Sequence, residues 1–157
     1  DLPSLDHPFP HVEEATIATI ISHTFNPYHL FKLDPRHHEK QQKKTLQLIG
    51  SSLEITSDET ALKDFKDLTS LMVPLMVYFE IIVHYAPPSL AGELSKLFFQ
   101  YSSHLHKVAS EYIWSAIVNY HVHFFLCRRQ EMRCGYYNFW AKQDSELASE
   151  HLHPYHK

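Results

Sequence analysis

Glycine scarcity is the feature that most limits what this chain can fold into. Three glycines occur in 157 residues, whereas the tight turns of all-β sandwiches and the loops that cradle phosphate depend on glycine. Apolar residues make up 44% of the chain and charged residues 20%, which excludes a disordered or fibrous protein. Because one domain usually holds roughly 100 to 200 residues, we expect residues 1–157 to form a single helical domain.

Apolar residues recur at helical spacing in three long segments, and we expect these to form the centre of the fold. Pro74 should kink or split the first of them, and Gly135 should end the last. The predicted class is therefore all-α, an irregular bundle of about five helices. The long segments cover residues 68–85, 90–109 and 111–133, with short helices near 13–23 and after Asp144, an extended lead-in at 1–12 and a tail at 151–157.

One segment departs from the helical pattern. In residues 45–56, leucine and isoleucine alternate with polar residues on either side of Gly50, which predicts a small β-hairpin. Since an isolated two-stranded hairpin is marginally stable in water, we expect it to pack against the helices.

Charge and cysteine content indicate which partners and which cellular compartment suit the protein. The net charge is −4 with neutral histidines, so any contact with nucleic acid must be local. Cys127 and Cys134 lie seven positions apart in one predicted helix, about 10 Å along its axis, and cannot bridge there. Two thiols favour a reducing compartment, the cytoplasm or nucleus. The apolar stretch at residues 71–85 is too short for a membrane span, and we expect no membrane partner.

Histidine is abundant, but its spacing does not predict a metal centre. His104 with His106, and His121 with His123, are two positions apart, which on a helix points the rings to nearly opposite sides. No CxxC or nucleophile signature occurs in the sequence, and Cys127 on an apolar helix face indicates core packing. We therefore expect no metal, no cofactor and no catalytic residues, with a metal-dependent enzyme as the least favoured alternative.

Two basic clusters stand out, each with a local charge of +3 over residues 32–44 and 128–142. The second precedes several aromatic residues, and guanidinium groups beside stacking rings are typical of single-stranded nucleic-acid binding. The alternative is that these cations offset the negative end of a helix and the rings close the core. The candidate nucleic-acid-binding residues are Arg128, Arg129, Arg133 and Lys142, and Arg36, Lys40, Lys43 and Lys44.

A resemblance extends over residues 16 to 157. The runs HTFNPYHLFKLDP, YSSHLHKVASEYIWSAIVNYH and RRQEM followed by CGYYNFWAKQDSEL resemble the gag-like segment of fungal proteins derived from mobile elements, including DIRS-type retroelements. The shared order is Trp114, Tyr120-His121, Arg128-Arg129, Met132, Gly135, Trp140, Asp144 and Leu147. The connector at residues 134–140 departs from the family pattern, since it lacks an acidic residue and a second glycine.

The resemblance implies a non-catalytic helical structural domain that self-associates, as a homo-oligomer, and contacts RNA or DNA of the element. In the family a zinc knuckle often follows such a segment. The alternative is a host protein derived from the element that acts as a monomeric nucleic-acid or protein-binding module.

Overall fold

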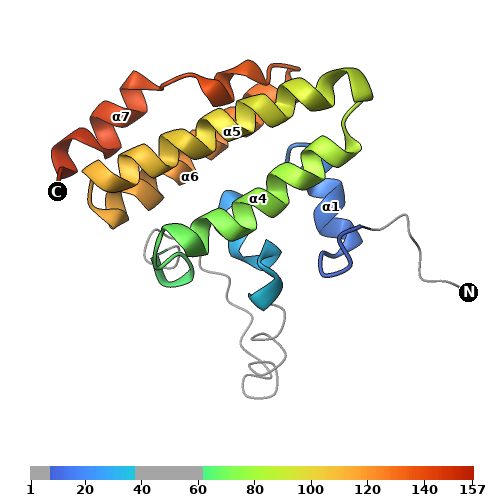
Figure 1. Cartoon of the computed structure of the whole chain (residues 1–157), viewed down its shortest axis with the longest axis horizontal. Coiled ribbons are helices and arrows are strands. Elements are labelled where there is room, and N and C mark those ends of the chain that lie inside the picture. Colours follow the sequence, from blue (N-terminus) through green and yellow to red (C-terminus); the bar gives the residue numbers. More distant parts are fainter. Residues whose placement is uncertain (1–7, 38–61) are drawn as a thin grey trace, which may run out of the picture.

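The computed structural model describes residues 8–37 and 62–157 of the chain (Figure 1). Within these ranges the chain is helical and contains no strand, which confirms the all-α class. The predicted hairpin at residues 45–56 lies outside the described residues. The α-helices are α1 (Glu14–Ile21), α4 (Leu68–Tyr85), α5 (Pro88–Glu111), α6 (Trp114–Arg133) and α7 (Ser145–His151), and the 3₁₀ helices are η1 (Pro27–Leu33), η2 (Asn138–Ala141) and η3 (His153–Tyr155).

All three long helices predicted from apolar spacing are present as α4, α5 and α6. Among the described residues the helical elements exceed the predicted five, because three short 3₁₀ helices form in segments expected as turns, connector and tail. Pro74 does not split α4, which runs unbroken from Leu68 to Tyr85 with Pro74 buried inside it.

The ends of the long helices have clear local causes. A capping box starts α4, in which the Asp67 carboxylate accepts from the Ser70 amide at 2.8 Å and Ser70 Oγ accepts from the Asp67 amide at 3.0 Å. Gly135 stops α6 as predicted, with φ of +89°. The Gly135 amide bonds Met132 O at 3.0 Å and the Tyr136 amide bonds Glu131 O at 2.9 Å. These two bonds form a Schellman motif, which requires a residue in the left-handed region.

An aromatic cluster around Trp140 joins the long helices. Trp140 lies in η2 and is 1% exposed. Aromatic rings from α4, α5 and α6 pack around it, with their centroids 5.1 to 5.8 Å from the centroid of the indole. Its indole Nε1 donates to Met132 Sδ at 3.3 Å. Such edge-to-face packing buries large apolar area and fixes the angles between the helices. The surrounding rings are Phe79, Phe98, Tyr101, Phe124 and Phe125.

α4 is the described helix that is long and apolar enough, by length and composition alone, to cross a membrane. In this fold 39% of that stretch is buried, and the helix packs against α1, η1 and α5. Figure 1 shows α4 in green beside α5 in yellow.

The last residues pack on the corner between α5 and α6, although the sequence predicted a tail at 151–157. The Ile113 amide bonds Tyr155 O and the Lys157 amide bonds Glu111 O, both at 3.0 Å. Leu152 is buried, and the rings of Tyr112 and His156 lie 4.4 Å apart. The buried leucine and these backbone bonds hold a segment that its polar composition alone would leave in solvent.

Candidate functional site

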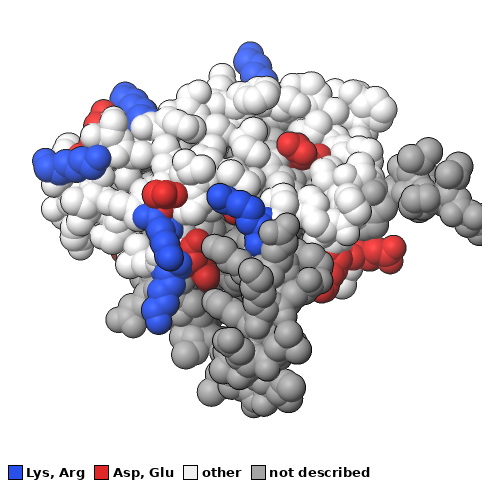
Figure 2. All heavy atoms as spheres, turned by 60° about the horizontal axis from the view of Figure 1, so that its bottom comes forward, with Lys and Arg blue, Asp and Glu red and all other residues white. Residues whose placement is uncertain are grey.

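The predicted nucleic-acid residues do not form one basic surface. On the face shown in Figure 2, Lys and Arg side chains lie interspersed with Asp and Glu. The positions of the individual residues therefore decide which of them can reach a phosphate.

Arg128 is a buried structural residue, contrary to its expected availability for phosphate. Its side chain is 6% exposed, and its Nε donates to Glu131 Oε1 at 2.5 Å. A second nitrogen, Nη2, lies 3.5 Å from Asp144 Oδ2, and the guanidinium stacks 4.4 Å over the Phe124 ring. Because Asp144 also caps α7 by accepting from the Leu147 amide, Arg128 braces α6 against the start of α7.

Arg129 ties α6 to the segment between α1 and η1. Its guanidinium donates to Phe25 O at 2.9 Å and to Thr24 O at 3.4 Å. Burial and then the charge of Arg133 lower its pKa. Part of its hydrogen-bonding capacity is thus used inside the fold.

Arg133 and Lys142 are the predicted cations at this end of α6 that remain exposed. Arg133 donates to the Gln130 side-chain oxygen, and Lys142 Nζ lies 4.8 Å over the Phe139 ring. Tyr136, which follows α6, is 60% exposed. These groups offer two exposed cations and one exposed ring, a chemistry suited to a phosphate and a nucleobase.

Two residues beside this end of α6 escaped the sequence analysis. His23 Nε2 and Tyr137 OH share a hydrogen bond of 2.9 Å across 114 positions of sequence. His23 has a φ of +59°, and burial together with the Arg133 charge lowers its pKa. The imidazole is therefore neutral near pH 7. No local signal could have found the pair, because the fold alone brings the end of α1 to the connector after α6.

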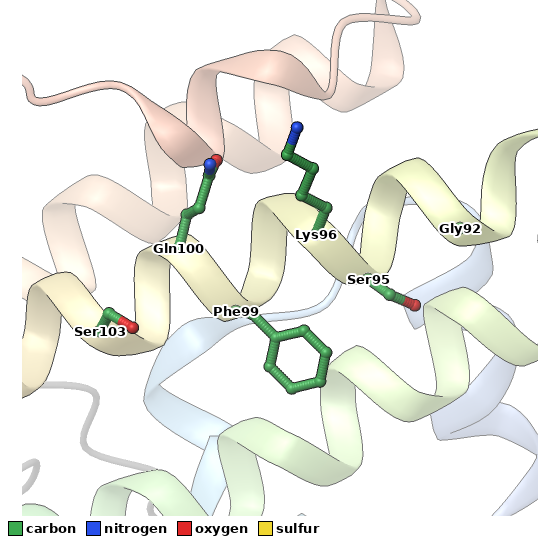
Figure 3. Close-up of a pocket in the computed structure, with 6 residues that line it drawn as sticks. All are labelled: Gly92, Ser95, Lys96, Phe99, Gln100 and Ser103. Carbon is green, nitrogen blue, oxygen red and sulfur yellow. The ribbon is translucent and has the colours of Figure 1, made fainter.

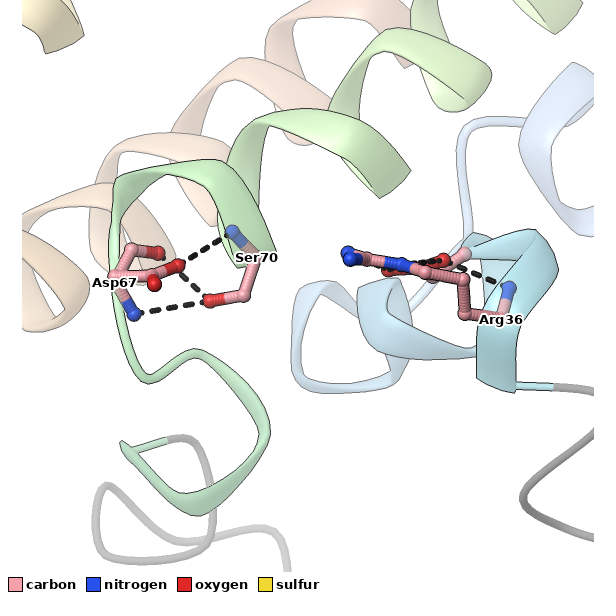
Figure 4. Close-up of polar contacts among 4 residues, drawn as sticks. Arg36, Asp67 and Ser70 are labelled. Atoms are coloured by element: carbon pink, nitrogen blue, oxygen red, sulfur yellow. Dashed lines mark hydrogen bonds and ion pairs between the residues drawn. The ribbon is translucent and has the colours of Figure 1, made fainter.

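In the first basic cluster, Arg36 is exposed but already paired. Its Nη2 lies 2.8 Å from Asp34 Oδ2 and its Nε 3.1 Å from Asp34 Oδ1. The guanidinium points toward the start of α4 (Figure 4), where Asp67 also contributes to raising its pKa. The other candidates of this cluster, Lys40, Lys43 and Lys44, lie outside the described residues.

A different surface combines an exposed aromatic ring with small neighbours. We call the outward side of α5 the α5 face, formed by Gly92, Ser95, Lys96, Phe99, Gln100 and Ser103 (Figure 3). Phe99 is 63% exposed. Beside it lies the α4–α5 groove, about 360 Å³ in volume, lined by Phe9, Met76, Phe79, Glu80, Val83, His84, Ser95, Phe98 and Phe99. Phe99 belongs to both features and stands at the border between them.

Two pairs of polar side chains on the long helices bond to each other inside the fold, whereas the buried Tyr78 hydroxyl and His121 Nε2 have no hydrogen-bond partner among the described residues. Tyr101 OH and His121 Nδ1 share a hydrogen bond of 2.6 Å. Burial lowers the pKa of His121 to about 3 and raises that of Tyr101, so both groups are uncharged at neutral pH. His104 and Tyr120 share a bond of 3.0 Å at a cleft of about 170 Å³.

Cys127 is exposed, as is Cys134, so the expected core packing of Cys127 is wrong. The buried side of α6 continues past this position through Arg128 and Met132, and Cys127 lies outside it. Desolvation raises the pKa of the Cys127 thiol. That shift reduces its thiolate fraction.

In the part of the chain that the structure describes, no group of three or more His, Cys, Asp or Glu side chains could hold a metal ion. Comparisons with protein-family models, curated proteins and solved structures found no match to this chain.

Proposed function

We propose that this chain is a non-catalytic, gag-like structural protein that associates with itself through helix faces and contacts nucleic acid locally. The α5 face carries the proposal. Phe99 is 63% exposed and borders an apolar groove, and covering the part of the ring that is still exposed contributes about 1–2 kcal/mol. A second copy of the chain can provide that cover, whereas solvent cannot.

The contacts that the buried polar side chains make inside the fold also support a structural role. Arg128 holds α6 and α7 together through Glu131 and Asp144. His121 and Tyr101 are buried and neutral, and bonded to each other. These polar groups thus hold the helices together, and the resemblance to gag-like segments implies a structural role of the same kind.

Nucleic-acid contact is the secondary part of the proposal. Arg133 and Lys142 are exposed, Tyr136 offers an open ring, and the chain as a whole is acidic. Weak binding that depends strongly on salt is expected from so few cations.

Sedimentation velocity tests the self-association over a concentration range from about 1 µM to about 1 mM, which brackets weak and transient complexes. A mass-average sedimentation coefficient that rises with concentration supports the proposal. A monomer across the whole range contradicts it.

A second candidate function is a monomeric nucleic-acid-binding module, which the exposure of Arg133 and Lys142 favours. It predicts that RNA or DNA binds to the monomer, and that Arg133→Ala with Lys142→Ala weakens binding and flattens its salt dependence. Exchanging Lys63 and Lys66 for Ala, two exposed cations outside both basic clusters, is the matched control. Binding that appears only in associated protein would exclude this candidate.

A further inference from the structure

The two sides of the α5 face carry different kinds of side chain. Lys96 and Gln100 rise on one side of α5, and Phe99 points to the other side, toward α4 (Figure 3). Gly92 leaves open space, since a Cβ there would meet no atom within 4 Å. Glu93 and Lys107 are exposed on the same helix.

We propose that the α5 face binds the α5 face of a second copy in antiparallel orientation, about a two-fold axis close to Phe99. The inference rests on the proposed self-association and names its surface and register. A two-fold axis of this kind keeps each side of the helix facing the same side of its partner. The two Phe99 rings therefore meet on the side of α4, where each ring also covers the partner's α4–α5 groove.

In this register the small residues of the α5 face lie opposite each other. Positions equally distant from Phe99 oppose each other, so Ser95 of one copy lies opposite Ser103 of the other. Two small side chains there permit the close approach of two helix axes, which varies between about 8 and 10 Å with the side chains in contact.

The charges on the other side are also complementary. Lys107 lies eight positions after Phe99 and Glu93 six positions before it, so opposed copies place them within about 3 Å of each other along the axis. Helical side chains lean toward the N-terminus of their own helix. In antiparallel helices the two side chains therefore lean toward each other, and two-fold symmetry forms the pair twice.

The size of the surface predicts a weak complex. α5 has 24 residues and is about 36 Å long, and a helix about 10 Å wide covers roughly 360 Å² on each copy. Even with the groove added, this is below the roughly 800 Å² per partner of a standard stable interface. Association in the high micromolar range is expected, with Phe99 as the dominant contact.

Disulfide cross-linking tests the register. In a chain with Cys127→Ser and Cys134→Ser, one sample carries Ser95→Cys and a second carries Ser103→Cys. In the proposed dimer the two different cysteines oppose each other, whereas identical cysteines lie about 12 Å apart along the axis, too far for a disulfide. Mixed samples should therefore form the heterodimer faster than either variant alone forms a homodimer.

A second measurement tests the surface. Phe99→Ala should weaken association at least about tenfold in sedimentation velocity, while Ile21→Ala, which removes another exposed apolar side chain, should leave it unchanged. Because Phe99 is exposed, the variant should keep the wild-type circular dichroism and melting temperature.

The outcomes separate the two proposals. A wild-type chain that stays monomeric overturns both of them. A chain that associates, but is unaffected by Phe99→Ala or forms homodimeric cross-links as fast as heterodimeric ones, overturns the α5 register and leaves self-association standing.

Discussion

Acidification should destabilise this fold through His121. Burial lowers the pKa of His121 from 6.5 to about 3 in the folded chain, whereas an unfolded chain restores the ordinary value. Between these values the unfolded state binds a proton that the folded state does not. The free energy of unfolding therefore keeps the full contribution of the neutral imidazole above pH 6.5 and loses it progressively as the pH falls toward 3.

The two pKa values set the size of the effect. Between these two pKa values, each fall of one pH unit lowers the free energy of unfolding by about 1.4 kcal/mol. Between pH 7 and pH 5 the accumulated loss is about 2 kcal/mol, because titration of the unfolded state begins only near pH 6.5. A loss of this size is a considerable part of the roughly 5–15 kcal/mol that stabilises a typical domain.

Urea unfolding at pH 7 and pH 5, followed by circular dichroism, measures the effect. His121→Gln removes the titration and can still accept a hydrogen bond from Tyr101, while His153→Gln, at an exposed position, is the matched control. Burial also lowers the pKa values of His23 and His104, and their contributions cancel when variants are compared. The reasoning is refuted if His121→Gln loses as much stability on acidification as the wild type.

Three further predictions concern stability at neutral pH. Trp140→Ala should cost about 3–5 kcal/mol in urea unfolding, and Trp140→Phe clearly less because a ring remains; equal costs would contradict a central role for the indole. Arg128→Ala should cost about 3 kcal/mol in thermal unfolding, since Glu131 and Asp144 lose their cation, and a change below about 1 kcal/mol would mean that the ion pairs are solvated. Gly135→Ala should cost about 1 kcal/mol in urea, because a Cβ meets nothing within 4 Å and only the positive φ is strained; an unchanged midpoint would contradict this.

The helices were predictable because their signal is local. Leu71, Leu75 and Tyr78 recur at helical spacing and are all buried in α4, and similar stripes define α5 and α6. Gly135 ended α6 as predicted because its position requires a positive φ that glycine adopts without strain.

The candidate site was less predictable because a residue type fixes charge but not partners. Arg128 and Arg133 lie on one helix, yet Asp144, which is 16 positions after Arg128, approaches Arg128 in the folded chain. The pairing of His23 with Tyr137 likewise depends on how α1 docks against the end of α6. The α5 face was missed because Phe99 lies beside the apolar stripe of α5, and only the packed helices show which ring remains outside.

The backbone bonds from Tyr155 and Lys157 to the α5–α6 corner tie the two ends of a long stretch of chain together without a covalent link. The enclosed stretch contains α6, η2 and α7. Closing a loop of this length costs entropy that its own contacts must repay. A fluorescent group attached to Lys157 should thus report whether this closure is formed.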